Sequence, residues 1–178
     1  MIIFTGVAGS GKSLQGKKLA DAKGLPWLST GEFLRMLISG KKRKDMLEGK
    51  LLNDQEIIAL VQRIFNVVDV KNEFVLDGFP RTLAQADWLL NQAKHGQLNI
   101  TAVVHLQASE KAVKNRLLSR GRQDDTDEAI IERFREYEHS ILPILENFRE
   151  AGVPVYDING EDDLEVVHLS IMTALRMK

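Results

Sequence analysis

The chain has 178 residues, 44% hydrophobic and 28% charged, which suits one globular domain with a sizeable buried core. Its formal net charge of −1 gives no electrostatic drive toward nucleic acid or membrane surfaces. It contains no cysteine, which excludes disulfides, thiol catalysis and a cysteine-ligated zinc site. Because no apolar stretch approaches the length of a membrane span, we expect a cytoplasmic protein without membrane or nucleic-acid partners.

Apolar, β-branched runs alternate with helical patterns along the whole chain. The predicted strands are 2–5, 25–28, 74–77, 102–106 and 153–158. The predicted helices are 13–22, 30–39, 54–69, 82–95, 109–120, 127–150 and 162–177. Strands that alternate with helices favour an α/β fold built on a doubly wound, five-stranded parallel sheet.

Two stretches are not needed by the sheet and are predicted to cover a site. One is the mostly helical insertion 30–58, in which the basic run 41–44 is expected to be a solvated loop. The other is the polar break 120–126 between two helices. The core of this single domain is then expected to comprise residues 1–29, 59–119 and 127–178.

Residues 6–13 read Gly-Val-Ala-Gly-Ser-Gly-Lys-Ser and match the phosphate-binding pattern G-x-x-x-x-G-K-[ST]. The pattern lies where an apolar strand gives way to a helix, which is the context that phosphate binding requires. Its glycines let backbone N–H groups turn toward phosphate oxygens, and Lys12 can reach the outer phosphates. Ser13 offers a hydroxyl to a magnesium ion. The alternative interpretation is a glycine-rich turn with no ligand.

Asp77 ends the apolar strand 74–77 and opens a turn that reads Asp-Gly-Phe-Pro-Arg-Thr at 77–82. Ligands of parallel sheets bind at the carboxyl ends of the strands, so this turn and the phosphate loop are expected to converge in space. An acid beside a phosphate loop can hold magnesium directly or through water. Alone, Asp77 would be interpreted as a turn or helix-capping residue, but the neighbouring loop favours the magnesium role.

Arginines gather in or next to the predicted covers and strand ends. They are Arg35, Arg81, Arg116, Arg120, Arg122 and Arg133. Any one of them alone would fit a solvated helix face, but the group favours phosphoryl transfer, which depends on positioning and charge stabilisation. The four histidines are scattered and offer no obvious general base, and His105 is expected to be packed in a strand. Transfer between phosphates needs no base, because an acceptor phosphate is already an anionic nucleophile.

These motifs, in this order, make the chain similar to the adenylate kinase family of nucleoside monophosphate kinases over nearly its whole length. The matching segments are 6–13, 29–35, 49–52, 77–82 with Gln85, and the arginines from 116 to 133. The resemblance implies the parallel sheet together with a helical monophosphate-binding insertion and a short lid. It also implies the magnesium-dependent reaction ATP + AMP ⇌ 2 ADP, which serves purine nucleotide biosynthesis and energy homeostasis.

The resemblance further implies a role for each matching residue. The expected ATP-binding residues are Gly9, Ser10, Gly11, Lys12, Ser13, Leu14, Arg116, Arg120 and Gly160. The expected AMP-binding residues are Thr30, Arg35, Lys50, Leu51, Leu52, Gly78, Phe79, Pro80, Arg81, Gln85, Arg122 and Arg133. The expected catalytic residues are Lys12, Arg81, Arg120, Arg122 and Arg133. The expected magnesium-binding residues are Ser13 and Asp77, in part through water.

Three of these roles are more specific. Arg116 would stack on the ATP adenine, Gln85 would read the AMP adenine, and Arg35 with Arg81 would hold the acceptor phosphate. The hydroxyl of Ser13 stands one position earlier than in many family members, so its magnesium role comes from the general phosphate-loop motif. The short lid leaves no room for the zinc-binding form of some relatives. We expect a monomer whose ligands are ATP, AMP and ADP.

The identity of the acceptor nucleotide has alternatives. Thr30 and Thr82 with Gln85 favour AMP, since relatives that use UMP or CMP often carry alanine and asparagine at the two threonine positions. A UMP/CMP kinase is the nearest alternative. The others are a phosphate-loop kinase for a small metabolite and a non-catalytic nucleotide-binding switch or assembly factor. The presence of Lys12 and Asp77 counts against the non-catalytic alternative.

Overall fold

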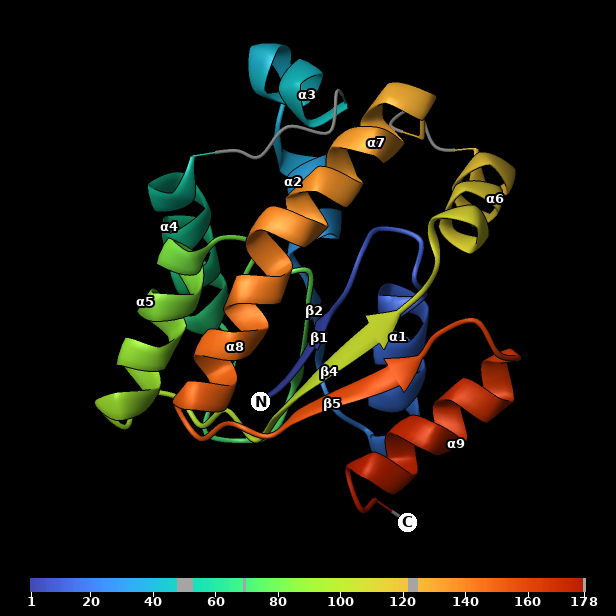
Figure 1. Ribbon diagram of the computed structural model, residues 1–178. Coiled ribbons are helices and arrows are strands. Elements are labelled where there is room, and N and C mark those ends of the chain that lie inside the picture. The colour runs from blue at the N-terminus through green and yellow to red at the C-terminus, as the bar shows by residue number, and fades with distance from the viewer. Residues whose placement is uncertain (48–52, 69, 122–124, 178) are drawn as a thin grey trace.

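A five-stranded parallel sheet forms the centre of the molecule (Figure 1). The computed structural model describes residues 1–47, 53–68, 70–121 and 125–177, without the side chains of residues 42, 45–47 and 120. The strand order is β2-β3-β1-β4-β5, so the strand that leads into the phosphate loop is the central one. The strands are β1 (Ile2–Thr5), β2 (Trp27–Ser29), β3 (Val75–Asp77), β4 (Ala102–Gln107) and β5 (Val155–Asn159). The predicted α/β fold with a doubly wound, five-stranded parallel sheet is confirmed.

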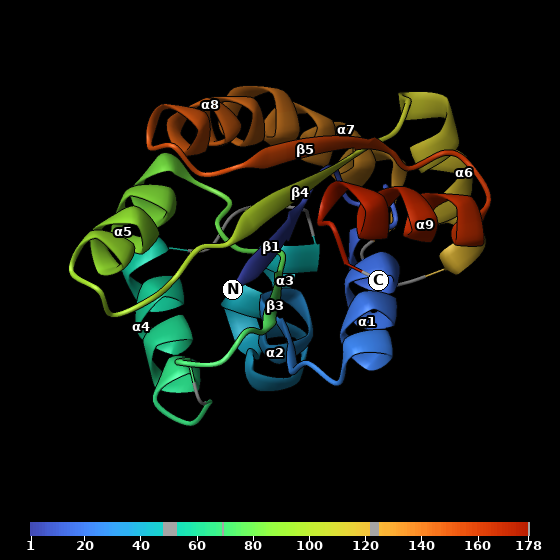
Figure 2. The same cartoon turned by 90° about the horizontal axis from the view of Figure 1, so that it is seen from below.

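Helices cover both faces of this sheet and connect its strands. They are α1 (Lys12–Lys23), α2 (Thr30–Leu37), α3 (Gly40–Leu47), α4 (Asp54–Phe65), α5 (Leu83–Lys94), α6 (Glu110–Arg120), α7 (Asp127–Glu136), α8 (Leu142–Glu150) and α9 (Leu164–Ala174). A π-helical segment, η1 (Tyr137–Ile141), joins α7 to α8. Figure 2 shows α1 and α9 on one side of the sheet and α4, α5 and α8 on the other.

Side chains of the central strand alternate between two hydrophobic cores, as the two-residue period of a strand requires. Ile2 and Phe4 pack with residues of α1 and α9, whereas Ile3 packs with residues of α4, α5 and α8. All four residues of β1 are buried, which is expected for a parallel strand covered on both faces. A third, smaller core lies under the phosphate loop, where Val7 packs against α6 and α7. The loop therefore rests on a rigid base.

Short polar side chains define where several helices begin. Ser29, Asn53, Thr82, Ser109 and Thr126 each accept a hydrogen bond from a backbone N–H in the first turn of the helix that follows. Such caps satisfy donors that have no partner within the helix, and each stabilises it by about 1 kcal/mol. Ser29 and Thr82 stand at the carboxyl edge of the sheet, so these caps also fix the chain beside the site.

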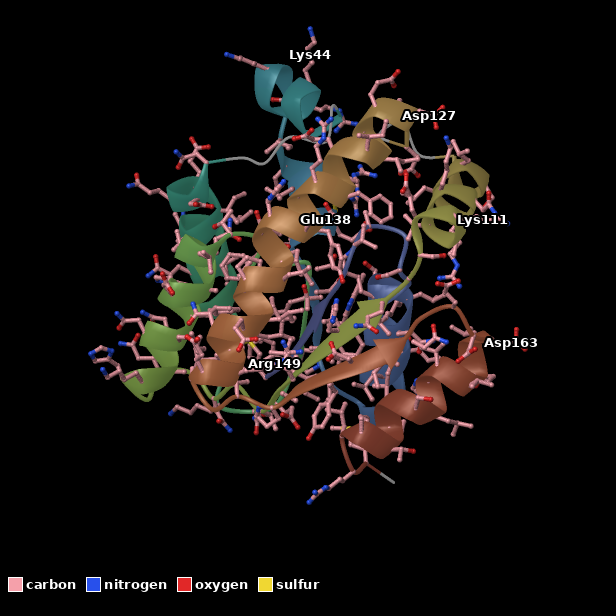
Figure 3. All side chains as sticks on the ribbon, viewed as in Figure 1. Lys44, Lys111, Asp127, Glu138, Arg149 and Asp163 are labelled. Carbon is pink, nitrogen blue, oxygen red and sulfur yellow. The ribbon has the colours of Figure 1, made fainter. Side chains whose placement is uncertain are left out.

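The structure corrects two local predictions. The basic run 41–44 was expected to be a solvated loop, but it lies within α3. Lysine and arginine are good helix formers, and this run lacks the apolar spacing by which an amphipathic helix is recognised. Figure 3 labels Lys44, one of its exposed side chains, on the helix that stands farthest from the sheet. The single helix predicted over 127–150 is interrupted by η1, for which the sequence pattern has no signal.

Candidate active site

The phosphate loop connects β1 to α1 at the centre of the carboxyl edge of the sheet. Gly6 has a φ of 135°, and a Cβ atom there would collide with the carbonyl oxygen of Leu106. Gly11, with a φ of 102°, precedes α1 and provides no side-chain cap. The first N–H groups of α1 are thus left without a capping side chain. Backbone donors at a helix N-terminus, with the positive end of its dipole, form an anion site.

Lys12 opens α1 and points its ammonium group toward this loop. Its Nζ donates to the carbonyl oxygen of Val7 at 3.4 Å. Burial of the ammonium end lowers the pKa of Lys12 from 10.5 to about 8. The charges of Asp77 and Glu136 oppose this shift, while the nearby guanidinium of Arg81 adds to it. A bound phosphate would supply the negative charge that returns Lys12 to its protonated form.

Asp77 ends β3 next to the phosphate loop and is only 1% exposed. One carboxylate oxygen, Oδ2, accepts from the hydroxyl of Ser29 at 2.9 Å. The other, Oδ1, is buried and has no hydrogen-bond partner among the residues that the structure describes. Asp77 and Ser13 line the same cleft. An unpartnered carboxylate oxygen and a nearby hydroxyl are hard oxygen donors, so these residues fit a magnesium ion.

Arg81 lies in the turn after β3 and lines the same cleft. Its Nε donates to the carbonyl oxygen of Gly78 at 3.1 Å, and its Nη1 lies 3.9 Å from Oε1 of Glu136. Arg133, on α7, donates from Nη1 to Oδ1 of Asp125 at 3.1 Å. The side chains of Arg133 and Asp125 are 10% and 1% exposed, so this ion pair is largely shielded from solvent. Both guanidinium groups are therefore held in place by carboxylates.

The expected monophosphate side is formed by α2 and the turn after β3. Arg35 lines the cleft, and its Nη2 donates to Oε1 of Glu32 at 2.7 Å. The hydroxyl of Thr30 donates to the carbonyl oxygen of Gly78 at 2.9 Å. Phe79 is 1% exposed, and its ring packs edge-on against Trp88 in the core. The side chains of Thr30 and Phe79 thus contact other groups of the protein.

Gln85 is held at both ends of its amide. Its Oε1 accepts from the backbone N–H of Arg81 at 2.8 Å, and its Nε2 donates to Oδ1 of Asp54 at 2.7 Å. The same Asp54 oxygen accepts from the Thr82 hydroxyl at 2.8 Å. Gln85 is only 3% exposed and does not line the large cleft. Its expected contact with adenine stays a prediction.

The expected ATP-base side lies between α6 and the loop after β5. Arg116 donates from Nη1 to the carbonyl oxygen of Gly160 at 2.8 Å. A Cβ atom on Gly160 would lie 2.7 Å from the carbonyl oxygen of Ser10 and 3.0 Å from that of Gln107. Only glycine therefore fits where this loop meets the phosphate loop. Arg116 lines the cleft, and its expected stacking on adenine stays a prediction.

One cleft of about 600 Å³ brings most of these residues together. Of the residues predicted from the sequence, those that line it are Gly9, Gly11, Lys12, Ser13, Leu14, Arg35, Asp77, Gly78, Arg81, Arg116 and Arg133. Pro80 lines a smaller cavity of about 30 Å³ next to it. Ser10 is 1% exposed, with its hydroxyl buried below the loop. Lys50, Leu51, Leu52, Arg122 and the side chain of Arg120 lie outside the described part of the chain.

Two acids for which the sequence predicts no such role hold the arginines. Glu136 is 12% exposed and faces Arg81, and Asp125 pairs with Arg133. Glu136 stands three residues after Arg133, a spacing that puts both on one face of α7, and this could have indicated it. The ion pair between Asp125 and Arg133 connects a predicted turn to the helix after it, so only the folded chain reveals this pair.

The fold and the site together define a nucleotide kinase of the phosphate-loop class. The sequence model of the family described as "Adenylate kinase" matches residues 4–153. The chain is 36% identical to the adenylate kinase of Prochlorococcus marinus (strain MIT 9211), over 98% of this chain and 96% of that protein. It is 37% identical to the adenylate kinase of Mycobacterium sp. (strain MCS), over 91% and 92%. It is 31% identical to the adenylate kinase of Archaeoglobus fulgidus, over 98% and 97%. The chain belongs to the adenylate kinase family.

The described residues also bear on other kinds of site. They contain no group of three or more histidine, cysteine, aspartate or glutamate side chains that could hold a metal ion. The expectation that the lid binds no zinc stays a prediction. None of the helices in the described ranges has both the length and the apolar character needed to cross a membrane.

Proposed function

We propose how the residues of this cleft perform the family's reaction. The chain is a nucleoside monophosphate kinase, and its reaction is the reversible transfer of a phosphoryl group from ATP to AMP, which gives two ADP. The observation that carries the assignment of residues is the convergence of Lys12, Asp77 and Arg81 on one cleft. Lys12 follows β1, whereas Asp77 ends β3 and Arg81 follows it; the parallel sheet brings these distant parts of the sequence together.

The donor nucleotide is proposed to bind along the phosphate loop and α6. Backbone N–H groups of Gly9, Gly11 and Lys12 surround its phosphates, and the Lys12 ammonium binds an outer phosphate oxygen. Arg116 and Gly160 hold the base end. A magnesium ion held by Ser13 and Asp77 would neutralise charge on the donor phosphates when bound.

The acceptor monophosphate is proposed to bind between α2 and the turn after β3. Arg35 and Arg81 hold its phosphate, and Arg133 stabilises the negative charge that spreads over the transferring group. Arg120 and Arg122 are proposed to join them from the short lid at 120–126. The insertion at 30–58 and this lid would exclude water, which competes as a phosphoryl acceptor. The core would then comprise 1–29, 59–119 and 127–178.

The first experiment measures initial rates with ATP and magnesium against AMP, dAMP, UMP, CMP and GMP. We expect fast formation of ADP with AMP and little transfer to pyrimidine nucleotides or GMP. A preference for UMP or CMP would overturn the base assignment while keeping the mechanism. No transfer to any acceptor, with ATP still bound, would instead favour a small-metabolite kinase or a non-catalytic nucleotide-binding protein.

A second experiment tests the role of Arg81. In Arg81→Ala we expect ATP binding to survive while kcat falls by about 10²- to 10³-fold, since one charge-stabilising group is lost. Arg63→Ala is the matched control, because Arg63 lies exposed on α4. Unchanged turnover in Arg81→Ala would overturn its role.

Three further expectations belong to the proposal. We propose that magnesium is required, that the enzyme is a monomer and that it works in the cytoplasm. Titration with magnesium, light scattering and cell fractionation test these in turn.

A further inference from the structure

Hydrogen bonds link the exposed end of α8 to the helical turn beside the cleft. Arg149 Nη2 donates to Asp157 Oδ2 at 3.0 Å, and Asp157 Oδ1 lies 2.6 Å from His105 Nδ1. On the other side of the ring, His105 Nε2 lies 2.8 Å from the Tyr137 hydroxyl. His105 and Asp157 are register partners on neighbouring strands, so their side chains leave the same face of the sheet. Figure 3 labels Arg149 in the last turn of α8.

For a neutral imidazole, the partners set the direction of each hydrogen bond. An ionised carboxylate can only accept a hydrogen bond, so Nδ1–H of His105 donates to Asp157. In the neutral imidazole, Nε2 is then an acceptor, and the Tyr137 hydroxyl donates to it. The charge of Arg149 compensates that of Asp157. Both ring nitrogens of His105 are thus satisfied.

The His105 ring at the centre of this arrangement is buried, which favours a single orientation of its partners. The His105 side chain is 1% exposed, and its ring stacks on the Tyr137 ring with centroids 5.8 Å apart and an interplanar angle of 25°. Burial raises the pKa of Tyr137, and the charge of Asp157 raises it further, so the phenol keeps its proton. A buried polar atom that loses its hydrogen-bond partner is disfavoured, which opposes other orientations of the Tyr137 hydroxyl.

Tyr137 stands where the helix changes its geometry. It is the first residue of η1, and its carbonyl oxygen accepts from the N–H of Leu142, five residues later. It directly follows Glu136, and Arg133 lies one turn before it. Tyr137 also lines the cavity of about 30 Å³, together with Lys12, Arg81 and Arg133. Single π turns are rare and often occur at functional sites.

We propose that His105, oriented by Asp157, is a positioning residue for phosphoryl transfer. Through the Tyr137 hydroxyl it fixes the rotation of the helical turn that presents Arg133 and Glu136 to the cleft. Without this bond the π turn could relax toward regular helix, and the two charged side chains would turn away from their settings. This inference rests on the proposed roles of Arg81 and Arg133.

The test compares two single-atom deletions. Tyr137→Phe removes the hydroxyl and keeps the stacked ring, whereas Tyr156→Phe removes the only other tyrosine hydroxyl of the chain, on β5. For Tyr137→Phe we expect kcat to fall about tenfold, with the KM values for ATP and AMP changed less than about twofold. Tyr156→Phe should match the wild type. Wild-type kcat in Tyr137→Phe would overturn the inference.

A second pair separates positioning from a general loss of stability. His105→Gln retains a side-chain oxygen that can accept from Tyr137, whereas His105→Leu retains none. We expect His105→Gln to keep several-fold more of kcat than His105→Leu, measured well below the Tm of either variant. Equal losses of kcat, or losses that follow Tm alone, would show a merely structural role and overturn the inference.

The failure of this inference can be distinguished from failure of the proposed function. Wild-type transfer from ATP to AMP, together with loss of kcat in Arg133→Ala, establishes that Arg133 acts in the reaction. If that variant loses kcat while Tyr137→Phe does not, His105 has no positioning role. If Arg133→Ala turns over normally, the inference is overturned together with the role of Arg133.

Discussion

Nη1 of Arg81 and Oε1 of Glu136 lie 3.9 Å apart, between the turn after β3 and the last turn of α7. The guanidinium is anchored on its other side by the carbonyl oxygen of Gly78. Glu136 and the carbonyl oxygen of Gly78 therefore hold the Arg81 guanidinium from two sides. The negative charge of Glu136 opposes the binding of a phosphate beside it. We therefore expect Glu136 to act by orienting the guanidinium of Arg81.

Replacing Glu136 by glutamine tests this orientation. We expect kcat to fall about tenfold in Glu136→Gln, with the KM for AMP changed by less than about threefold, because Arg81 keeps its charge but loses its fixed direction. Steady-state kinetics measure both values. Glu138→Gln is the control, since Glu138 is exposed on the same helical run and is labelled in Figure 3. A lower KM for AMP with unchanged kcat would mean that Glu136 merely opposes the phosphate.

ATP binding should take up protons in the alkaline range. Free Lys12, with a pKa of about 8, is protonated below that pH and increasingly neutral above it. Phosphate raises the pKa of Lys12 again, so binding above pH 8 draws a proton from solution and weakens as pH rises. Calorimetry in two buffers with different heats of ionisation counts the protons. An affinity and proton count that do not vary between pH 7 and 9 would contradict this.

The free enzyme should be more stable without the Lys12 ammonium. Because the pKa of Lys12 in the folded protein, about 8, is below the ordinary lysine value of 10.5, the charged form destabilises the fold. The cost is fully present below pH 8 and disappears as pH rises from 8 to 10.5. Lys12→Met should thus gain of order 1 kcal/mol at pH 7 and lose activity. Urea unfolding at pH 7 and pH 10 measures the difference.

Lys17→Met serves as the control for that comparison, because Lys17 is exposed on the same helix. Its stability should stay near that of the wild type at both pH values. If Lys12→Met were less stable than the wild type at pH 7, its ammonium would be contributing stability instead.

Asp77→Asn should raise the magnesium requirement. The substitution keeps the shape of the side chain and an oxygen for Ser29, but it removes the charge at Oδ1. We expect half-maximal activation to need at least about tenfold more magnesium, since carboxylate is the strongest oxygen ligand available there. Activity titrated with magnesium at fixed ATP gives this value. The exposed Asp21 provides the control variant, Asp21→Asn, and an unchanged magnesium curve in Asp77→Asn would remove the metal role.

We expect that lysine cannot take over the function of Arg133 in phosphoryl transfer. The guanidinium of Arg133 pairs with Asp125 through Nη1. A planar guanidinium has five N–H donors in a fork that matches phosphate oxygens two at a time, which a single ammonium does not provide. We expect kcat of Arg133→Lys to fall by about 10²-fold. Arg135→Lys is matched to it, because Arg135 is 67% exposed two residues away on the same helix. Similar kcat values for the two variants would show that charge alone suffices.

Features with local signals could be predicted from the sequence. The phosphate loop was predictable because its glycines are needed for a specific backbone path, as the close approach of Gly6 to Leu106 shows. The alternation of strands and helices likewise predicted the parallel sheet, and that sheet predicted that Lys12 and Asp77 share a cleft. Strand ends were less certain: β2 is three residues long and is shifted toward Ser29.

Features that depend on distant partners could not be predicted. His105 pairs with residues 32 and 52 positions away, and it was expected only to be packed. Nothing near it in the chain distinguishes a packed histidine from one with two hydrogen-bonded partners. The helix α3 was missed for the opposite reason, since its local signal is helix propensity without an apolar face.

The close approach of Gly160 to Ser10 fixes the distance between the loop after β5 and the phosphate loop. There is no room for a Cβ atom between Gly160 and the carbonyl oxygen of Ser10, and the carbonyl oxygen of Gly160 accepts from Arg116, so the loop after β5 is held close to the phosphate loop. For a donor nucleotide bound as proposed, the distance between its phosphate site and its base site would then be set by the sheet and its loops. The base end would accept only a donor of matching length, and movement of the covers would leave that limit unchanged.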